Sequence, residues 1–235
     1  MKATTKIIVD SYDQFLRGIG KDPISDEGFI KWGLKHVKMG DASDAYDSVC
    51  GIIDDINNKK NRQMYIRCYG KDKNGDAFKR LYEKLWPEIT IKIDGDNNHE
   101  PNKCICENVK CNLSGKAAFN NEWIYLQNYQ CAHIFGRTKN PILFTALFNL
   151  SLIPKLYDPL TGHETKGWLS EMFVEELSSK FRSVYKESIE KYEEFRSKEY
   201  GKIISAAENL PLEEFSEKRK KFFMNRVEKE WSQLS

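Results

Sequence analysis

Apolar residues recur at helical spacing in three segments of the first part of the chain. The segment SDEGFIKWGLKHV begins with Ser25 and Asp26, which are typical of a helix N-terminus. Pro87 ends the third segment. The periodic apolar positions are Phe29, Ile30, Leu34 and Val37, then Tyr46, Val49, Cys50, Ile53 and Ile56, then Phe78, Leu81, Leu85 and Trp86. We therefore predict that residues 1–92 form a small helical bundle that serves as a recognition region.

The pattern changes in residues 93–167 and changes back after them. DGDNNHEPNK is rich in turn formers and predicts a loop, whereas EWIYLQNY and NLSLIP are typical of short strands. From residue 168 onward the helical spacing returns, with a loop near Asn209–Pro211 and a last helix that carries EKRKKFFMNRVEKEW. One apolar stripe consists of Leu169, Phe173, Leu177, Phe181, Val184 and Tyr185. The chain is thus predicted to be α+β and predominantly helical, with three regions, 1–92, 93–167 and 168–235.

Composition narrows the class of protein without deciding its function. The chain has 235 residues, 40% of them apolar, and its 37 basic and 35 acidic residues leave a net charge of +2. This balance neither requires nor excludes nucleic acid, because local patches matter more than totals. The first residues contain no secretory segment, and no apolar run approaches the ~18 residues of a membrane-spanning helix. These observations predict a cytoplasmic protein.

The cysteines suggest a metal site. In a reducing compartment the six cysteines argue against a disulfide framework. CICENVKC brings Cys104, Cys106 and Cys111 close together, and Cys131 follows. Four thiolates are preferred ligands of structural Zn²⁺, so we predict a zinc site at these residues, with His99 as a substitute for one thiol of the Cys-x-Cys pair. The alternative is a set of unrelated reduced thiols, as we expect for Cys50 and Cys68.

Two histidines and an asparagine follow a recognisable order. His133 ends the first strand-like run, Asn149 begins the second, and His163 precedes a run of helix formers. The order is strand, loop, strand, helix. Together with AHI, NLSLIP, GHE and the flanking cysteines, it resembles the HNH, or ββα-metal, nucleases over residues 104–167. The resemblance implies a central ββα-metal unit, braced by the zinc cluster and flanked by the helical regions.

The resemblance also implies a mechanism. His133 would act as the general base on water, Asn149 would brace the loop between the strands, and His163 would bind one Mg²⁺ or Mn²⁺ ion. Asp158 is a candidate second ligand of that ion. The reaction implied is hydrolysis of a DNA phosphodiester to a 5′-phosphate and a 3′-hydroxyl, as in restriction or phage-defence enzymes.

One position departs from the family pattern. Many members carry a metal ligand immediately before the catalytic histidine, where this chain has Ala132. Three explanations stay open: Asp158 and His163 act with water alone, the protein is an inactive relative, or the residue was engineered. Each histidine also has a simpler interpretation. His133 can be a zinc ligand in a Cys131-x-His133 pair, and His163 can be a solvated residue at a helix start.

Basic residues predict contacts with DNA. Arg137 and Lys139 lie in the loop between the two strands, and the last helix adds Lys218, Arg219, Lys221 and Arg226. A solvated helix face is the alternative for the last four. A homodimer would let two sites cut both strands. The leading hypothesis is thus a metal-dependent DNA endonuclease, and the alternative is a zinc-stabilised nucleic-acid-binding protein without catalysis.

Overall fold

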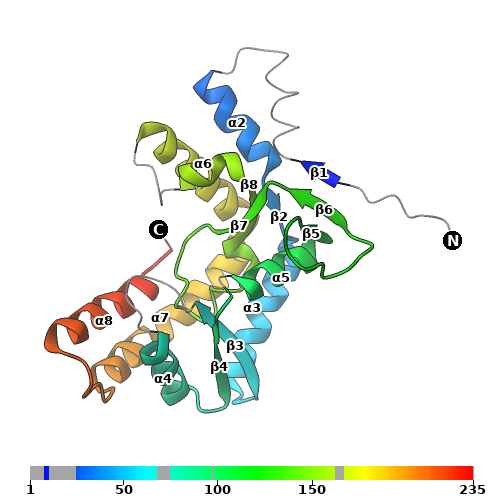
Figure 1. The fold of residues 1–235 in the computed structure, drawn as a ribbon. Helices are drawn as coiled ribbons and strands as arrows, with labels where there is room; N and C mark the ends of the chain where they lie inside the picture. The colour runs from blue at the N-terminus through cyan, green and yellow to red at the C-terminus, as the bar shows by residue number, and fades with distance from the viewer. Residues whose placement is uncertain (1–7, 11–24, 68–74, 97, 162–166, 235) are drawn as a thin grey trace.

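The computed structural model describes residues 8–10, 25–67, 75–96, 98–161 and 167–234. These residues form an α+β fold that is mostly helical, with short strands in three small sheets (Figure 1). The predicted fold class is confirmed at this level. No helix within the described ranges is long and apolar enough to cross a membrane.

The first two predicted helices are confirmed. Helix α2 (Asp26–His36) begins after Ser25, whose Oγ accepts a hydrogen bond from the Gly28 N–H at 3.1 Å. Helix α3 (Ala42–Asn57) begins after Asp41, whose carboxylate accepts the N–H groups of two residues of its first turn. Three positions of the predicted stripe of α3, Val49, Ile53 and Ile56, are buried in the core together with Ala45 and Ile52, whereas Tyr46 is exposed and Cys50 is half-buried.

The remainder of residues 1–92 corrects the prediction of a helical bundle. Strand β3 (Arg62–Arg67), helix α4 (Gly75–Leu85) and strand β4 (Ile89–Asp94) follow one another, and the two strands pair in parallel. Met64 and Ile66 alternate with more exposed residues on β3, and this period of two is the mark of a strand. The region is therefore a βαβ unit with α2 and α3 beside it.

The start of the middle region is also more helical than predicted. Helix α5 (His99–Val109) includes residues 99–103, which we expected in a loop. The Asp94 carboxylate accepts the N–H groups of Asp96 and Glu100, both at 3.1 Å, so the turn passes directly into the helix. Strands β5 (Cys111–Leu113) and β6 (Ile124–Gln127) follow, and with β1 (Ile8–Asp10) they form a parallel sheet in the order β1-β6-β5.

The second predicted strand, NLSLIP, is confirmed. The run predicted as the first strand is divided at Asn128, whose φ is +58°, into β6 and a further strand, β7 (Tyr129–His133), which belongs to another sheet. Strands β7 and β8 (Leu150–Pro154) are antiparallel, with Cys131 opposite Leu152 and His133 opposite Leu150. Strand β2 (Lys38–Met39) pairs with the other edge of β8. A short 3₁₀ turn, η1 (Leu147–Asn149), leads into β8. All five residues of β8 are buried, so the hairpin is rooted in the core.

A second 3₁₀ segment, η2 (Lys155–Thr161), connects the hairpin to helix α6 (Trp168–Val184). The ring of Tyr157 lies against Gly33 of α2, where a Cβ atom would overlap it, and the Tyr157 hydroxyl donates to the Phe29 carbonyl at 2.6 Å. Any larger residue in place of Gly33 would push η2 away. Helix α2 thus fixes the segment that carries Asp158.

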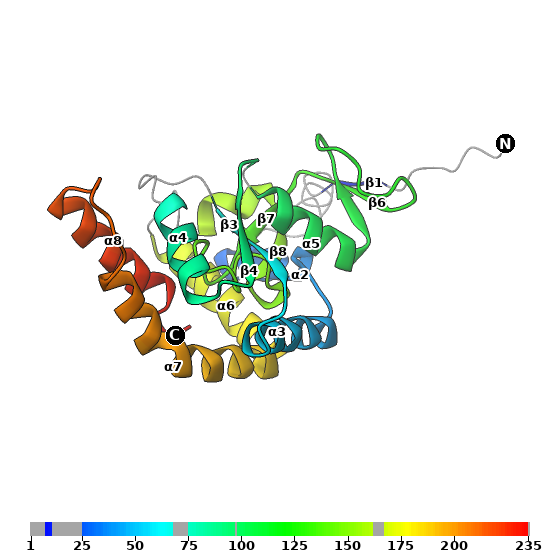
Figure 2. The same ribbon diagram turned by 90° about the horizontal axis from the view of Figure 1, so that it is seen from below.

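The last two helices close the core around a group of aromatic rings. Helix α7 (Lys186–Glu208) packs against α3, α4 and α8 (Glu217–Glu230), and Figure 2 shows α7 along one edge of the molecule next to α3. The loop after α7 and the last helix confirm the sequence prediction. The rings of Tyr82 in α4 and Trp86 just after it are stacked, with centroids 5.7 Å apart, and each also meets the ring of Trp231.

Candidate functional site

The loop that joins β7 to β8 places His133 at a fixed point. The His133 Nε2 lies 2.9 Å from the carbonyl oxygen of Phe144, and its ring stacks on the Phe144 ring at 5.3 Å with an interplanar angle of 8°. A carbonyl only accepts hydrogen bonds, so Nε2 carries a proton in this contact. The Phe144 carbonyl and ring thus fix the orientation of the His133 imidazole.

Asn149 braces that loop, as expected. Its side chain is fully buried, its Oδ1 accepts the Phe135 N–H at 2.8 Å, and its Nδ2 donates to the carbonyls of Gly136 and Leu143, both at 2.9 Å. The backbone of Asn149 also accepts the Ile134 N–H at 2.9 Å. One amide therefore ties together both ends of the loop that follows His133.

His133 opens into a cleft of about 950 Å³. Its lining joins segments that are far apart in sequence. They are the C-terminal end of β3, the start of α5, the strands β5 and β7, the β7–β8 loop, η2 and the C-terminal end of α8. Six basic residues and two acidic residues line it, namely Arg67, Lys116, Arg137, Lys155, Arg226, Lys229, Asp158 and Glu230. This excess of positive charge suits an anionic ligand.

The predicted catalytic residues are brought together only in part. Asp158 and Ala132 line the cleft beside His133. Ala132 pairs with Ser151 in the hairpin and offers no metal ligand. His163 lies outside the described residues. Among the residues described, no three His, Cys, Asp or Glu side chains lie together so as to hold a metal ion, so the cation stays a prediction.

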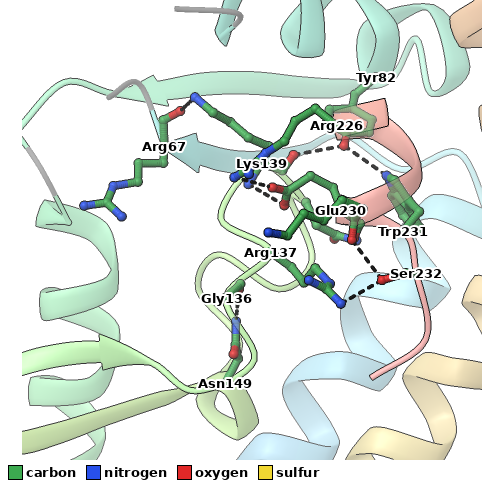
Figure 3. A network of polar contacts seen from close by, with 12 residues as sticks. Arg67, Tyr82, Gly136, Arg137, Lys139, Asn149, Arg226, Glu230, Trp231 and Ser232 are labelled. Carbon is green, nitrogen blue, oxygen red and sulfur yellow. Dashed lines mark hydrogen bonds and ion pairs between the residues drawn. The ribbon is translucent and has the colours of Figure 1, made fainter. Parts of the chain in front are cut away.

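The loop also contains the two predicted DNA contacts, which differ sharply. Arg137 lines the cleft, and its Nη2 donates to Ser232 Oγ at 2.7 Å. Lys139 is 1% exposed, and its ammonium donates to the Arg67 carbonyl at 2.5 Å (Figure 3). The Lys139 side chain is therefore part of the interior, and its predicted contact with DNA is corrected. Its role is to join the loop to the end of β3.

The C-terminal segment holds the loop from the other side. Glu230 is 1% exposed, accepts the Lys139 N–H at 2.9 Å, and pairs with Arg226 at 2.8 Å (Figure 3). Burial raises the pKa of Glu230, and the Arg226 guanidinium opposes this shift. The Glu230 carbonyl also accepts from Asn140 Nδ2 at 3.2 Å. The candidate site thus depends on residues at the far end of the sequence.

The basic residues of α8 divide into two groups. Arg226 and Lys229 lie at the cleft, whereas Lys218, Arg219 and Lys221 are exposed and outside its lining. The Arg219 guanidinium lies 3.8 Å from the centroid of the Phe215 ring. Their exposure fits both a solvated helix face and a contact with DNA, and the three residues lie outside the candidate site.

The cysteines do not form the predicted tetrahedral set. Cys104 and Cys106 lie two apart on α5, so their side chains leave the helix on opposite sides. The Cys104 thiol donates to the Thr145 carbonyl at 3.1 Å, and the Cys106 thiol bonds the thiol of Cys111. Among the described residues these thiols do not meet the arrangement of a metal site. His99, the substitute ligand, is exposed at the start of α5.

The thiols themselves are shifted by their surroundings. Burial raises the pKa of Cys104 to about 11 and that of Cys131 to about 12. Its hydrogen bond with Cys111 raises the pKa of Cys106, and the same bond lowers that of Cys111.

Sequence reasoning missed several residues of the cleft. Arg67, Lys116 and Lys155 come from segments that showed no motif, and Lys229 and Glu230 lie in the basic last helix without having been selected there. Arg67 ends β3, and its N–H donates to the Thr138 carbonyl at 2.9 Å. Parallel strands direct their carboxyl ends toward one edge of a sheet, so recognising the βαβ unit would have pointed to Arg67. For the other four, the sequence carries no comparable signal.

Comparisons with known proteins identify relatives but no activity. The family described as "Uncharacterised protein PM1201" matches residues 42–234. A protein of Pasteurella multocida (strain Pm70), "Uncharacterized protein PM1201", is 33% identical over 202 residues, which are 77% of this chain and 86% of that protein. No solved structure matches the chain. The match extends from α3 to the end of α8 and includes the whole hairpin and cleft, so the chain belongs to the PM1201 family.

Proposed function

We propose that this protein is a metal-dependent DNA endonuclease of the ββα-metal type. The observation that carries the proposal is the hairpin. His133 stands at the end of β7 with Nε2 on a backbone carbonyl, and Asn149 at the start of β8 ties the loop between them. The resemblance to HNH nucleases implies this division of roles between the two residues. The site opens into a basic cleft, which suits a polyphosphate backbone.

In the proposed reaction, His133 accepts a proton from water at Nδ1. The water oxygen forms a bond to phosphorus, the bond between phosphorus and the 3′ oxygen breaks, and the leaving oxygen takes up a proton from solvent. The products are a 5′-phosphate and a 3′-hydroxyl. Stacking on Phe144 and the Phe144 carbonyl hold the imidazole so that the same nitrogen faces the water in each turnover.

A divalent cation belongs to the proposal, with Asp158 and His163 as its ligands. When bound, Mg²⁺ or Mn²⁺ would stabilise the charge that develops on the phosphate oxygens. Asp158 lines the cleft on η2, which α2 fixes through Tyr157. His163 lies five positions further along, outside the described residues.

The test is cleavage of supercoiled plasmid in the presence of Mg²⁺ or Mn²⁺. We expect wild-type protein to cut it and His133→Ala to lose roughly 10²-fold or more of the rate, the usual contribution of a general base. His36→Ala is the matched control, since His36 stacks on Trp32 in α2 and does not line the cleft. No cutting by wild-type protein, or equal cutting by both variants, would contradict the proposal.

The form of the product tests the homodimer. A single site nicks one strand and yields open circles, whereas a symmetric pair of sites yields linear DNA. We propose the pair. Open circles as the only product, at protein concentrations where the chain is monomeric by light scattering, would argue for a single site.

A second function is favoured by Ala132. Because this position offers no ligand where many HNH nucleases have one, the protein can also act as a DNA-binding protein without catalysis. Salt-sensitive binding without cleavage supports this alternative. If Ala132→Asp then cuts plasmid, the fold is that of a disabled nuclease. If it does not, the loss of activity lies elsewhere.

The structural zinc is a separate part of the proposal, and it enters no step of the reaction. It rests only on the spacing of Cys104, Cys106, Cys111 and Cys131 in the sequence, and the arrangement of the described thiols does not support it. Zinc near one per chain by elemental analysis would support it. Protein purified without chelator and free of zinc would remove it.

A further inference from the structure

The end of α8 and the β7–β8 loop form one wall of the cleft, which we call the α8 wall and define by Arg137, Arg226, Lys229 and Glu230. Arg137 and Glu230 belong to the network of Figure 3, in which Ser232 bridges the loop and the chain end. Ser232 accepts from Arg137 Nη2 and donates to the Lys229 carbonyl at 3.0 Å. Two segments distant in sequence thus present their cations from one rigid unit.

Arg137 is held in an unusual backbone conformation. Its φ is +58°, in the left-handed region that costs a residue with a Cβ about 1 kcal/mol or more. The Asn140 N–H donates to its carbonyl at 3.0 Å, and Ser232 holds one end of its guanidinium. The Arg137 Nε is buried and has no hydrogen-bond partner among the described residues. The positive φ and the unpaired Nε both cost stability, and the guanidinium is nevertheless held at the cleft.

The one acid of the α8 wall is turned inward. The Glu230 carboxylate is buried and occupied by the Lys139 N–H and by Arg226. Lys229 is exposed, and its backbone is fixed by the last turn of α8. The surface that the wall presents is therefore cationic, with a fork-shaped donor at Arg137 and a point charge at Lys229.

The cations of the cleft are spread over every wall rather than gathered around one point. Lys116 follows β5, Lys155 begins η2, and Arg67 ends β3. A single free phosphate is bound by donors that converge on one point. A polyanion that crosses the cleft would meet several of them in succession.

We infer that the α8 wall binds a backbone phosphate of the DNA strand next to the scissile one, with Arg137 and Lys229 as its ligands. This deepens the proposed function and rests on DNA as the ligand of the cleft. The N-terminal half of α8 takes no part in it. Lys221 lies eight residues before Lys229, roughly 12 Å along the helix axis, and outside the cleft.

The test compares Lys229→Ala with Lys221→Ala, two exposed lysines of one helix. Binding of a labelled duplex oligonucleotide is measured by fluorescence anisotropy over a series of salt concentrations, without divalent cations so that no cleavage occurs. We expect Lys229→Ala to weaken binding and to lower the slope of log K against log salt by about one, and Lys221→Ala to leave the slope in place. Equal effects of the two variants, or none from Lys229→Ala, overturn the inference.

Arg137 provides an independent arm. Arg137→Lys keeps the charge and loses the fork, so the affinity should fall while the salt slope stays near that of the wild type. Thermal unfolding of this variant separates a lost contact from a lost fold. An unchanged affinity in a folded Arg137→Lys protein counts against the inference.

Competitors identify the ligand, and the His133 variant separates the two proposals. Inorganic pyrophosphate that displaces the duplex at equal phosphate concentration would indicate a free-phosphate site, and tighter binding of RNA of the same sequence would indicate RNA; either result overturns the inference as stated. A slope change in Lys229→Ala without any plasmid cleavage supports the phosphate site and contradicts the nuclease. Cleavage that requires His133, without a slope change in Lys229→Ala, supports the nuclease and contradicts the phosphate site.

Discussion

The hairpin around His133 and the thiols beside it differ in how the backbone directs their side chains. On the hairpin, antiparallel pairing sets His133 opposite Leu150, and Asn149 stands directly before that pair. Residues that are sixteen positions apart in the sequence are therefore neighbours, because the register permits one arrangement only. The amide of Asn149 then reaches across the loop to three backbone groups.

The thiols follow the opposite rule. Cys104 and Cys106 are almost adjacent in the sequence, yet the helix sends them to different partners, a carbonyl of the β7–β8 loop and Cys111. Cys111 reaches Cys106 because Lys110 adopts a left-handed conformation, with φ of +58°, between α5 and β5. Cys104 and Cys106 are thus close in sequence but have different partners, whereas His133 and Asn149 are far apart in sequence but are neighbours in the hairpin.

The comparison predicts that the hairpin loop is the more sensitive of the two regions. Asn149→Ala would leave the Phe135 N–H and the carbonyls of Gly136 and Leu143 without their partner. The bonds to Phe135 and Gly136 connect the start of the loop with its end. Buried groups without partners cost about 1–3 kcal/mol each, so we expect a loss of about 3–5 kcal/mol in the free energy of unfolding. Urea denaturation measures it.

Asn120→Ala is the matched control for that change. Asn120 is exposed, and its Oδ1 accepts the Glu122 N–H at 2.8 Å. We expect its loss to cost less than about 1 kcal/mol. If the two variants unfold at similar urea concentrations, the loop is not held by Asn149 and the comparison fails.

A second change tests whether the hairpin loop is also held from the α4 and α8 side. The fully buried hydroxyl of Tyr82 donates to the Lys139 carbonyl at 2.9 Å and accepts from Trp231 Nε1 at 3.0 Å. Tyr82→Phe keeps the ring and strands both partners, so we expect a loss of about 2–3 kcal/mol by urea denaturation. Tyr65→Phe, at a partly exposed tyrosine of β3, should change stability by less than half as much.

The sequence predicted the parts of the fold whose pattern is local. The α2, α3, α6 and α8 segments show the helical period, Ser25 indicates the start of α2, and the short apolar run NLSLIP indicates β8. The βαβ unit was missed because Met64 and Ile66 are only two apolar positions, too few to reveal a period of two. The parallel pairing of β3 with β4 depends on α4, which connects the two strands and packs against them, and this is a tertiary effect.

The candidate site divides in the same way. His133 and Asn149 could be assigned from sequence because one motif contains both. The position of Lys139 could not be predicted, because a lysine is normally exposed. In the fold, its buried ammonium donates to the Arg67 carbonyl and its backbone N–H donates to Glu230. Glu230 had no signal either, because its partners come from a loop ninety-one positions earlier. The pattern of charged residues in a sequence predicts exposed helix faces well, but it does not predict which charged side chains are buried and paired.

The smallest expected effect is on the rate at which the thiols Cys104 and Cys131 react, and it tests how well the thiol region is buried. Because burial raises the pKa of Cys104 to about 11 and that of Cys131 to about 12, both stay protonated at pH 8. Thiolates are the reactive form, so we expect iodoacetamide to modify both at least about tenfold more slowly in native protein than in urea. Mass spectrometry of the digested protein reads each cysteine separately.

The pH dependence of that rate fixes the cause. An unperturbed thiol ionises near pH ~8.5, so the unfolded form gains thiolate from there upward, while the native form gains it only toward pH 11–12. Because the native pKa is raised, these thiols favour the folded state below pH ~8.5, and that contribution is lost as pH rises through the native values. Labelling of native Cys131 should therefore accelerate with pH up to the point where the fold itself is weakened. Rapid labelling of Cys131 at pH 8 would mean that the thiols are neither buried nor protonated, and the contrast with the tightly held hairpin would disappear.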